Sequence, residues 1–171
     1  MKKLGFGCMR LPLKNKKIGG SVDLEKTKEM VETAEKLSKL INISKEDLED
    51  IKERDLKDFW IIMNPKAAGK KVTKKELSDK KDKELYKLQL ERITEEELSS
   101  FTKAELKTLA IFRKFNSGTY LTPQTVKNKD VTDEEMARVT ENLDELPGVD
   151  TSVDWNRAYP FDSTLRSILG R

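Results

Sequence analysis

Apolar residues recur at helical spacing over most of the chain. Between residues 24 and 41 they fall on one side of a helix, at Leu24, Val31, Ala34, Leu37 and Ile41, with charged residues between them. Similar segments, separated by turn-forming residues, continue to residue 145. The pattern predicts helices over 24–41, 45–57, 74–92, 95–100, 103–115 and 133–145.

Most of these helices begin with a hydroxyl residue that is followed three positions later by an acid. The two side chains satisfy backbone N–H groups that the first helical turn leaves unpaired. The pairs are Ser44 with Asp47, Thr73 with Glu76, Thr94 with Glu97, Thr102 with Glu105, and Thr132 with Glu135. For the first helix, Asp23 is the expected cap.

The two ends of the chain alternate with strand period instead. After the Pro147-Gly148 turn, apolar and polar residues alternate from Val149 to Trp155, which predicts a strand with one face inward. An alternation of Leu4, Phe6 and Cys8 predicts a short strand or hairpin within the first 20 residues. We therefore expect an α+β fold that is mostly helical, with a few short strands at the two ends.

Composition limits the size of the core. The 171 residues are 36% hydrophobic and 38% charged, so we expect a thin core and no large buried catalytic cleft. The expected core residues of segment 44–145 are Leu85, Leu88, Leu106, Leu109, Ile111, Phe112, Met136, Val139 and Leu143. A net charge of +3, with the two signs interleaved, indicates a solvated helical surface and gives nucleic-acid binding little support.

Several kinds of chemistry are disfavoured by residue content. The chain has no histidine and one cysteine, Cys8, which excludes Ser-His-Asp, Cys-His and His-metal sites and an internal disulfide. We expect no metal and no cofactor. Since no apolar run approaches the roughly 20 residues that span a bilayer, and no signal or anchor is evident, we expect the chain as given to be soluble.

Lysines gather between residues 66 and 83. Eight lysines stand there against three acids, a local balance of 8 − 3 = +5. One interpretation is an exposed loop and first helical turn. The other is contact of Lys70, Lys71, Lys74 and Lys75 with an anionic polymer or with lipid head groups.

Several long runs of the chain carry a family resemblance. They are Leu121-Thr-Pro-Gln-Thr-Val-Lys-Asn128 and residues 53–60, 83–93, 109–118, 146–149 and 164–170. These runs resemble the pedestal (dimerisation) domain of class B penicillin-binding proteins from low-GC Gram-positive bacteria, and the likeness covers roughly residues 28 to 170.

The resemblance implies a non-catalytic module that positions a transpeptidase domain and contacts cell-wall synthesis or division proteins. The family is extracytoplasmic and membrane-anchored, and its anchor and transpeptidase domain would lie outside this sequence, so we expect an incomplete module. Neither the partner nor the oligomeric state follows from the sequence.

One box of this family is structural. Arg157-Ala-Tyr159-Pro160 resembles its Arg-x-Tyr-Pro signature, and Gly170 closes the last of the similar runs. The resemblance implies that Arg157, Tyr159, Pro160 and Gly170 determine the fold and are not catalytic. Asp162 stands where relatives typically have glycine, which predicts a different or strained turn.

Residues 1–31 carry a second resemblance. Residues 4–12 are similar to the opening hairpin of aldo/keto reductases, and residues 23–31 to that family's first helix, although no barrel follows. We therefore divide the chain into 1–22, a reductase-like strand or hairpin segment, and 23–171, an incomplete pedestal domain. The alternative function is a composite chain without retained function, or a reductase remnant.

Transpeptidases of this family use a Ser-x-x-Lys motif, and the chain contains two matches. Ser78 with Lys81 lies in the lysine-rich stretch, and Ser100 with Lys103 spans a helix junction where Thr102 is better used as a cap. Neither has a Ser-x-Asn or Lys-Thr-Gly partner motif. We expect both to be chance matches and the chain not to be an enzyme.

Overall fold

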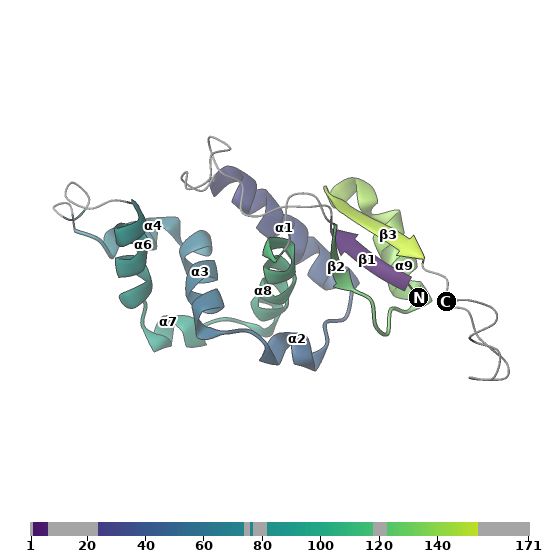
Figure 1. The fold of residues 1–171 in the computed structure, drawn as a ribbon, viewed down its shortest axis with the longest axis horizontal. Helices are drawn as coiled ribbons and strands as arrows, with labels where there is room; N and C mark the ends of the chain where they lie inside the picture. The colour runs from purple at the N-terminus through teal and green to yellow at the C-terminus, as the bar shows by residue number, and fades with distance from the viewer. Residues whose placement is uncertain (1, 7–23, 74–75, 77–81, 118–122, 154–171) are drawn as a thin grey trace, which may run out of the picture.

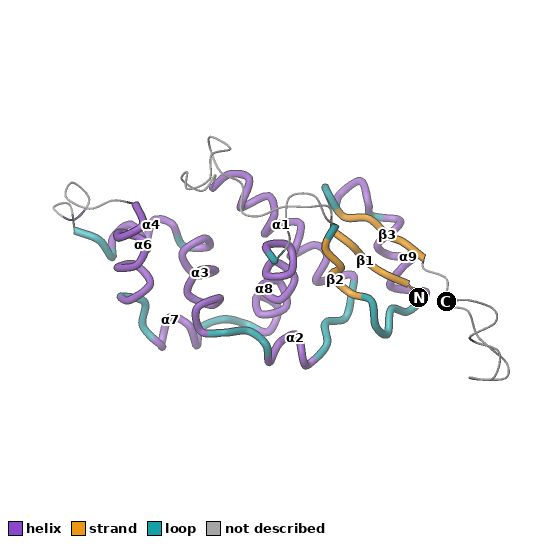
Figure 2. The backbone as a smooth tube through the Cα atoms, viewed as in Figure 1, coloured by secondary structure: helices purple, strands orange, loops and turns teal. Residues whose placement is uncertain are grey.

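The computed structural model describes residues 2–6, 24–73, 76, 82–117 and 123–153, and it confirms a mostly helical α+β fold (Figure 1). Figure 2 shows an elongated body, with the sheet at one end and α4 and α6 at the other. The elements are β1 (Lys2–Phe6), α1 (Leu24–Leu40), α2 (Lys45–Glu49), α3 (Glu53–Met63), α4 (Pro65–Lys70), α6 (Asp82–Glu91), α7 (Glu95–Ser99), α8 (Lys103–Asn116), β2 (Gln124–Lys127), α9 (Asp133–Glu141), η1 (Leu143–Glu145) and β3 (Val149–Val153).

The sheet joins segments that are far apart in the sequence. Its order is β2-β1-β3, with β1 antiparallel to both neighbours. Phe6 lies opposite Gln124 on one side and Val149 on the other. The strand of segment 1–22 thus pairs with two strands of segment 23–171, while the boundary between these segments stays a prediction.

The main core lies between α1, α8 and the sheet. The predicted apolar side of the first helix is buried at Val31, Ala34, Leu37 and Ile41. From α8, the residues Leu109, Ile111, Phe112 and Phe115 enter the same cluster, and Val126, Val139, Leu146 and Val149 close it from the sheet and α9. This burial is the main driving force for the fold, at about 25 cal/mol per Å² of apolar surface.

A second, smaller cluster stabilises the α4–α7 end. It contains Trp60, Ile61, Ala68, Ile93 and Leu98. Helix α3 supplies residues to both clusters, because Phe59 and Ile62 belong to the main core. The two cores are therefore joined through the successive residues of a single helix.

Four of the predicted caps are confirmed. Ser44, Thr94, Thr102 and Thr132 are the N-caps of α2, α7, α8 and α9. The fifth pair, Thr73 and Glu76, makes the expected hydrogen bond from the Thr73 N–H to the Glu76 carboxylate, at 2.9 Å. The predicted cap Asp23 lies outside the described residues.

Three predictions about elements were wrong. The expected helix 45–57 is two helices, α2 and α3, because the Lys52 N–H bonds the Asp55 carboxylate at 3.1 Å and starts a new helix. Asn64-Pro65 ends α3, as a helix-breaking pair is expected to do. Pro65 also fits the first turn of α4, a helix that the sequence pattern does not predict. The prediction also missed β2.

The core prediction holds in part. Leu109, Ile111, Phe112 and Val139 are buried, and Met136 and Leu143 pack against them half-buried. Leu85, Leu88 and Leu106 are also half-buried and belong to neither cluster. In the final strand Val149 is buried as expected, but Val153 is 64% exposed, so the inward face covers only its beginning.

Candidate functional site

Most residues singled out from the sequence lie outside the described part of the chain. These are the family-box residues and two of the lysines, namely Arg157, Tyr159, Pro160, Gly170, Lys74 and Lys75. Their roles remain predictions. Lys70 and Lys71 are described, and their environments differ.

Lys71 is used inside the molecule, whereas Lys70 is exposed at the end of α4. The Lys71 ammonium donates to the Glu97 carboxylate at 2.6 Å and to the Arg92 carbonyl at 2.9 Å. It also lies 5.4 Å from the centre of the Trp60 ring, within cation–π range. Lys71 therefore anchors the smaller core, whereas Lys70 is exposed and has no ion pair or hydrogen bond to another described residue.

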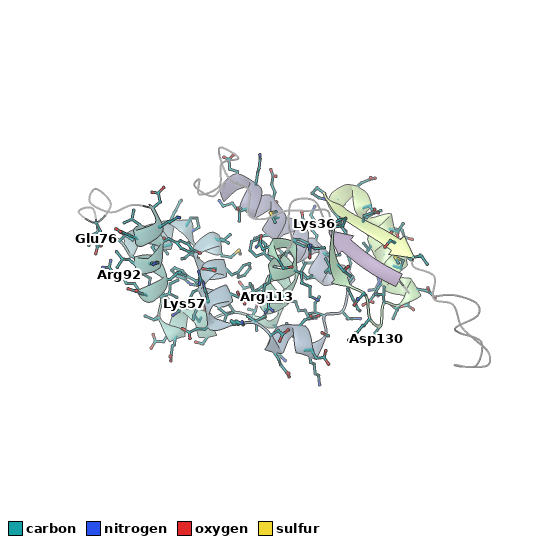
Figure 3. All side chains as sticks on the ribbon, viewed as in Figure 1. Lys36, Lys57, Glu76, Arg92, Arg113 and Asp130 are labelled. Carbon is teal, nitrogen blue, oxygen red and sulfur yellow. The ribbon has the colours of Figure 1, made fainter. Side chains whose placement is uncertain are left out.

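Arg92 makes the reciprocal contact with Lys71. Its guanidinium donates to the Lys71 carbonyl at 2.6 Å and binds Glu76 through both terminal nitrogens, at 2.9 and 2.7 Å. Figure 3 shows Glu76 and Arg92 together at the α6 end of the molecule. The hydrogen bonds from Arg92 and Thr73 hold the pKa of Glu76 well below its usual range.

Glu135 forms a buried charged node that the sequence analysis treated only as a cap. Its carboxylate accepts hydrogen bonds from Lys127 Nζ at 2.8 Å, the Asn42 N–H at 2.7 Å and the Thr132 N–H at 3.2 Å. Burial opposes ionisation of this 1% exposed side chain, but those donors outweigh it and lower the pKa of Glu135. The node ties α9 to β2 and to the end of α1.

The Ser-x-x-Lys match at Ser100 has structural duties. The Ser100 hydroxyl donates to the Glu97 carbonyl at 2.8 Å at the end of α7, and Lys103 is an exposed residue at the start of α8. Thr102 caps α8, as expected. Ser78 and Lys81 lie outside the described residues.

The described residues contain neither a candidate metal cluster nor a candidate membrane-spanning helix. Within these ranges no three His, Cys, Asp or Glu side chains gather closely enough to hold a metal ion. In the same part of the chain, none of the helices has the length and apolar character needed to cross a membrane.

An open groove runs between α1, α3 and α8, and we define it as the α1–α8 groove. Its volume is about 580 Å³, and its apolar lining includes Val31, Phe59 and Met63. Met63, the last residue of α3, is 45% exposed. Sequence reasoning missed this groove, because its walls come from three helices whose spacing no local pattern encodes.

The two hydroxyl residues among the described residues that line the groove are both paired. The Ser38 hydroxyl donates to the Glu35 carbonyl at 2.7 Å, and that of Thr108 donates to the Ala104 carbonyl at 3.1 Å. The two oxygens approach each other at 3.5 Å. Polar recognition in the groove must therefore come from its rim.

The charged residues that line the groove are three lysines and two glutamates, a net charge of 3 − 2 = +1. Glu35 and Lys39 neutralise each other at 2.8 Å, and Glu105 accepts from the Thr102 N–H and hydroxyl. Lys103 and Lys107 line the α8 side, and neither has an ion pair or hydrogen bond to another described residue. Since they are four positions apart on one helix, they lie on the same face.

Comparisons with known proteins find a matching family model and similar sequences. The sequence model of the family "Penicillin-binding Protein dimerisation domain" matches residues 13–171. Penicillin-binding protein 2A of Bacillus subtilis is 49% identical over 142 residues, covering 80% of this chain. Penicillin-binding protein H of the same organism is 37% identical over 179 residues, covering 88% of it.

A solved structure agrees on the fold. Penicillin-binding protein 2B of Streptococcus pneumoniae superposes with a TM-score of 0.62 over 99% of this chain, at 20% identity, and the match covers 24% of that protein. The chain spans only 19% and 25% of the two Bacillus relatives. The resemblance seen in the sequence is confirmed, whereas the likeness of residues 1–31 to reductases stays a prediction.

Proposed function

Since the chain belongs to the penicillin-binding protein dimerisation-domain family, we propose that it is the non-catalytic pedestal of a peptidoglycan transpeptidase. The family match over residues 13–171 carries this proposal. In this role the domain positions the catalytic domain and contacts other proteins of cell-wall synthesis or division. Its place of action is the outer face of the membrane, where members of this family are anchored.

The physical character of the chain supports this role. Two small cores joined through α3 make an elongated spacer, and the exposed faces are densely charged. The ion pairs Lys71–Glu97 and Lys127–Glu135 fix elements of the two ends in place. A domain that positions a neighbouring domain needs internal order, and these ion pairs supply it.

The family-box residues and the lysines have separate roles in this function. Arg157, Tyr159, Pro160 and Gly170 act in folding and seating, not in chemistry. Contact with an anionic polymer uses Lys70 together with Lys74 and Lys75, because Lys71 is committed to Glu97.

The first test is the gene. An open reading frame that continues past Arg171 into Ser-x-x-Lys and Lys-Thr-Gly motifs supports the pedestal, and an immediate stop supports the composite chain. The second test is binding of the purified protein to a panel of purified extracytoplasmic cell-wall synthesis and division proteins by biolayer interferometry. Failure to bind any of them would overturn the interaction role.

A further inference from the structure

We propose that the α1–α8 groove docks an acidic amphipathic segment of a partner protein. The inference rests on the proposed interaction role and specifies the surface and the chemistry of the partner. The partner segment places an apolar side chain against Met63, and its carboxylates meet Lys103 and Lys107.

The shape of the groove fits a polypeptide segment. It is partly open to solvent and lined by residues of α1, α3 and α8, so a ligand bound there stays in contact with water on one side. Small-molecule sites bury most of the ligand and place polar groups around it. Here the floor hydroxyls of Ser38 and Thr108 are already used by carbonyls of their own helices.

The exposed side chain of Met63 supplies the apolar attraction. Met63 is among the few large apolar side chains of the described residues that remain widely exposed, and it lies beside buried Phe59. A flexible thioether at the mouth of an apolar groove adapts to different side chains at low cost. Covering it with a partner's leucine or phenylalanine removes apolar surface of both from water.

Charge selects the partner. The Glu35–Lys39 pair is neutral, and Glu105 keeps its negative charge at the Thr102 cap, so together with Lys103 and Lys107 the described lining residues carry a net charge of 3 − 2 = +1. Lys107 is half-buried, which reduces screening of its charge. An acidic segment gains from both lysines, whereas a basic one is repelled, which gives specificity and a faster association.

The probe for the test is a fluorescein-labelled amphipathic peptide of about 14 residues, with leucines at i, i+3 and i+7 and glutamates beside them. Its control has lysine at every glutamate position. Fluorescence anisotropy with the purified protein should give a Kd of about 10–100 µM for the acidic peptide and at least tenfold weaker binding for the basic one. Amide shifts in NMR should map to α1, α3 and α8.

Variants separate the groove from general charge effects. Lys103→Glu/Lys107→Glu should weaken acidic-peptide binding about tenfold, and Met63→Ala about threefold, with unchanged thermal melting. The matched control is Lys129→Glu, an exposed lysine outside the groove, which should leave binding unchanged. Equal binding of both peptides, shifts elsewhere, or equal losses from Lys129→Glu would overturn the proposal.

The remaining outcomes are also decisive. A dimer in sedimentation that Met63→Ala dissolves would show that a second copy fills the groove, against the proposal. If a panel protein binds and neither the acidic peptide nor Lys103→Glu/Lys107→Glu affects it, the groove proposal fails while the pedestal role stands. If the peptide binds in the groove and no panel protein does, the groove stands and the panel role fails.

Discussion

Lys71 and Arg92 each donate a side-chain hydrogen bond to the main-chain carbonyl of the other, at 2.9 and 2.6 Å. Each cation is also paired with a carboxylate, Lys71 with Glu97 and Arg92 with Glu76. The pair thereby joins the end of α4 to the end of α6, across a separation of 21 residues. It fixes the smaller core, which has few apolar residues to hold it.

Replacing Lys71 should weaken that core. Lys71→Met leaves the Glu97 carboxylate and the Arg92 carbonyl without their donor, so we expect unfolding to cost about 1–2 kcal/mol less than in the wild type. Urea denaturation followed by circular dichroism measures the change. Its neighbour Lys70 is the control, since Lys70→Met at an exposed position should change stability by less than about 0.5 kcal/mol. Equal effects would contradict the anchoring role of Lys71.

The buried node at Glu135 should matter more. Glu135→Ala removes the acceptor of two backbone N–H groups and leaves Lys127 without its partner, at a cost of about 3 kcal/mol. The matched substitution is Glu134→Ala, at a side chain that is 88% exposed in the same helical turn. Differential scanning calorimetry should show a clear fall in Tm for the first variant and almost none for the second.

The same carboxylate predicts a pH dependence. Because the folded-state pKa of Glu135 lies below the ordinary value of 4.5, its stabilisation is complete above that pH and is lost as the pH falls through the lower folded-state value. Glu135→Gln lacks this titration, so the gap in stability between wild type and variant should narrow below about pH 4.5. Urea titrations at successive pH values test it, and a gap that widens on acidification would contradict the lowered pKa.

Two leucines of α8 should differ in how much they contribute to stability. Leu109 is 2% exposed within the main core, so Leu109→Ala should cost about 2–5 kcal/mol. Leu106 lies one turn earlier but is half-buried and outside both clusters, so Leu106→Ala should cost less than about 1.5 kcal/mol. Urea midpoints compare them directly, and similar losses would mean that Leu106 carries core packing.

The chain should not react with β-lactams. Acylation needs a serine deprotonated by a positioned base, and the Ser100 hydroxyl donates instead to a carbonyl beside an exposed Lys103. Intact-mass measurement after incubation with a fluorescent penicillin should show no adduct. A stoichiometric adduct that Ser100→Ala or Ser78→Ala abolishes would overturn this expectation.

Local signals predicted the helices that begin at hydroxyl caps, because a cap and its acid lie within one turn. Thr102 and Thr132 thus located α8 and α9 correctly. The helix start at Lys52 was missed because its backbone N–H, bonded to the Asp55 carboxylate, is a group that every residue except proline has. Strand β2 was missed because its partner, β1, lies some 120 residues away, where no local pattern reveals it.

The candidate site was less accessible from sequence. The lysine-rich stretch was visible, but the division between Lys70, which is exposed, and Lys71, which binds Glu97, depends on where α7 packs. The α1–α8 groove needs three helices in register before Met63 and Lys107 share a surface. An apolar residue ending α3 beside a polar turn was the one local hint.

The position of β1 in the centre of the sheet has a consequence for the order in which the strands pair during synthesis. A ribosome makes residues 2–6 before both of their partner strands, since one partner is complete only at Lys127 and the other only at Val153. Helices α1 to α8 can gather their own contacts in the meantime, since these close over shorter stretches of chain. Of the three strands in this sheet, the one made first therefore completes its pairing only after the other two exist, and until then its unpaired backbone groups form hydrogen bonds with water.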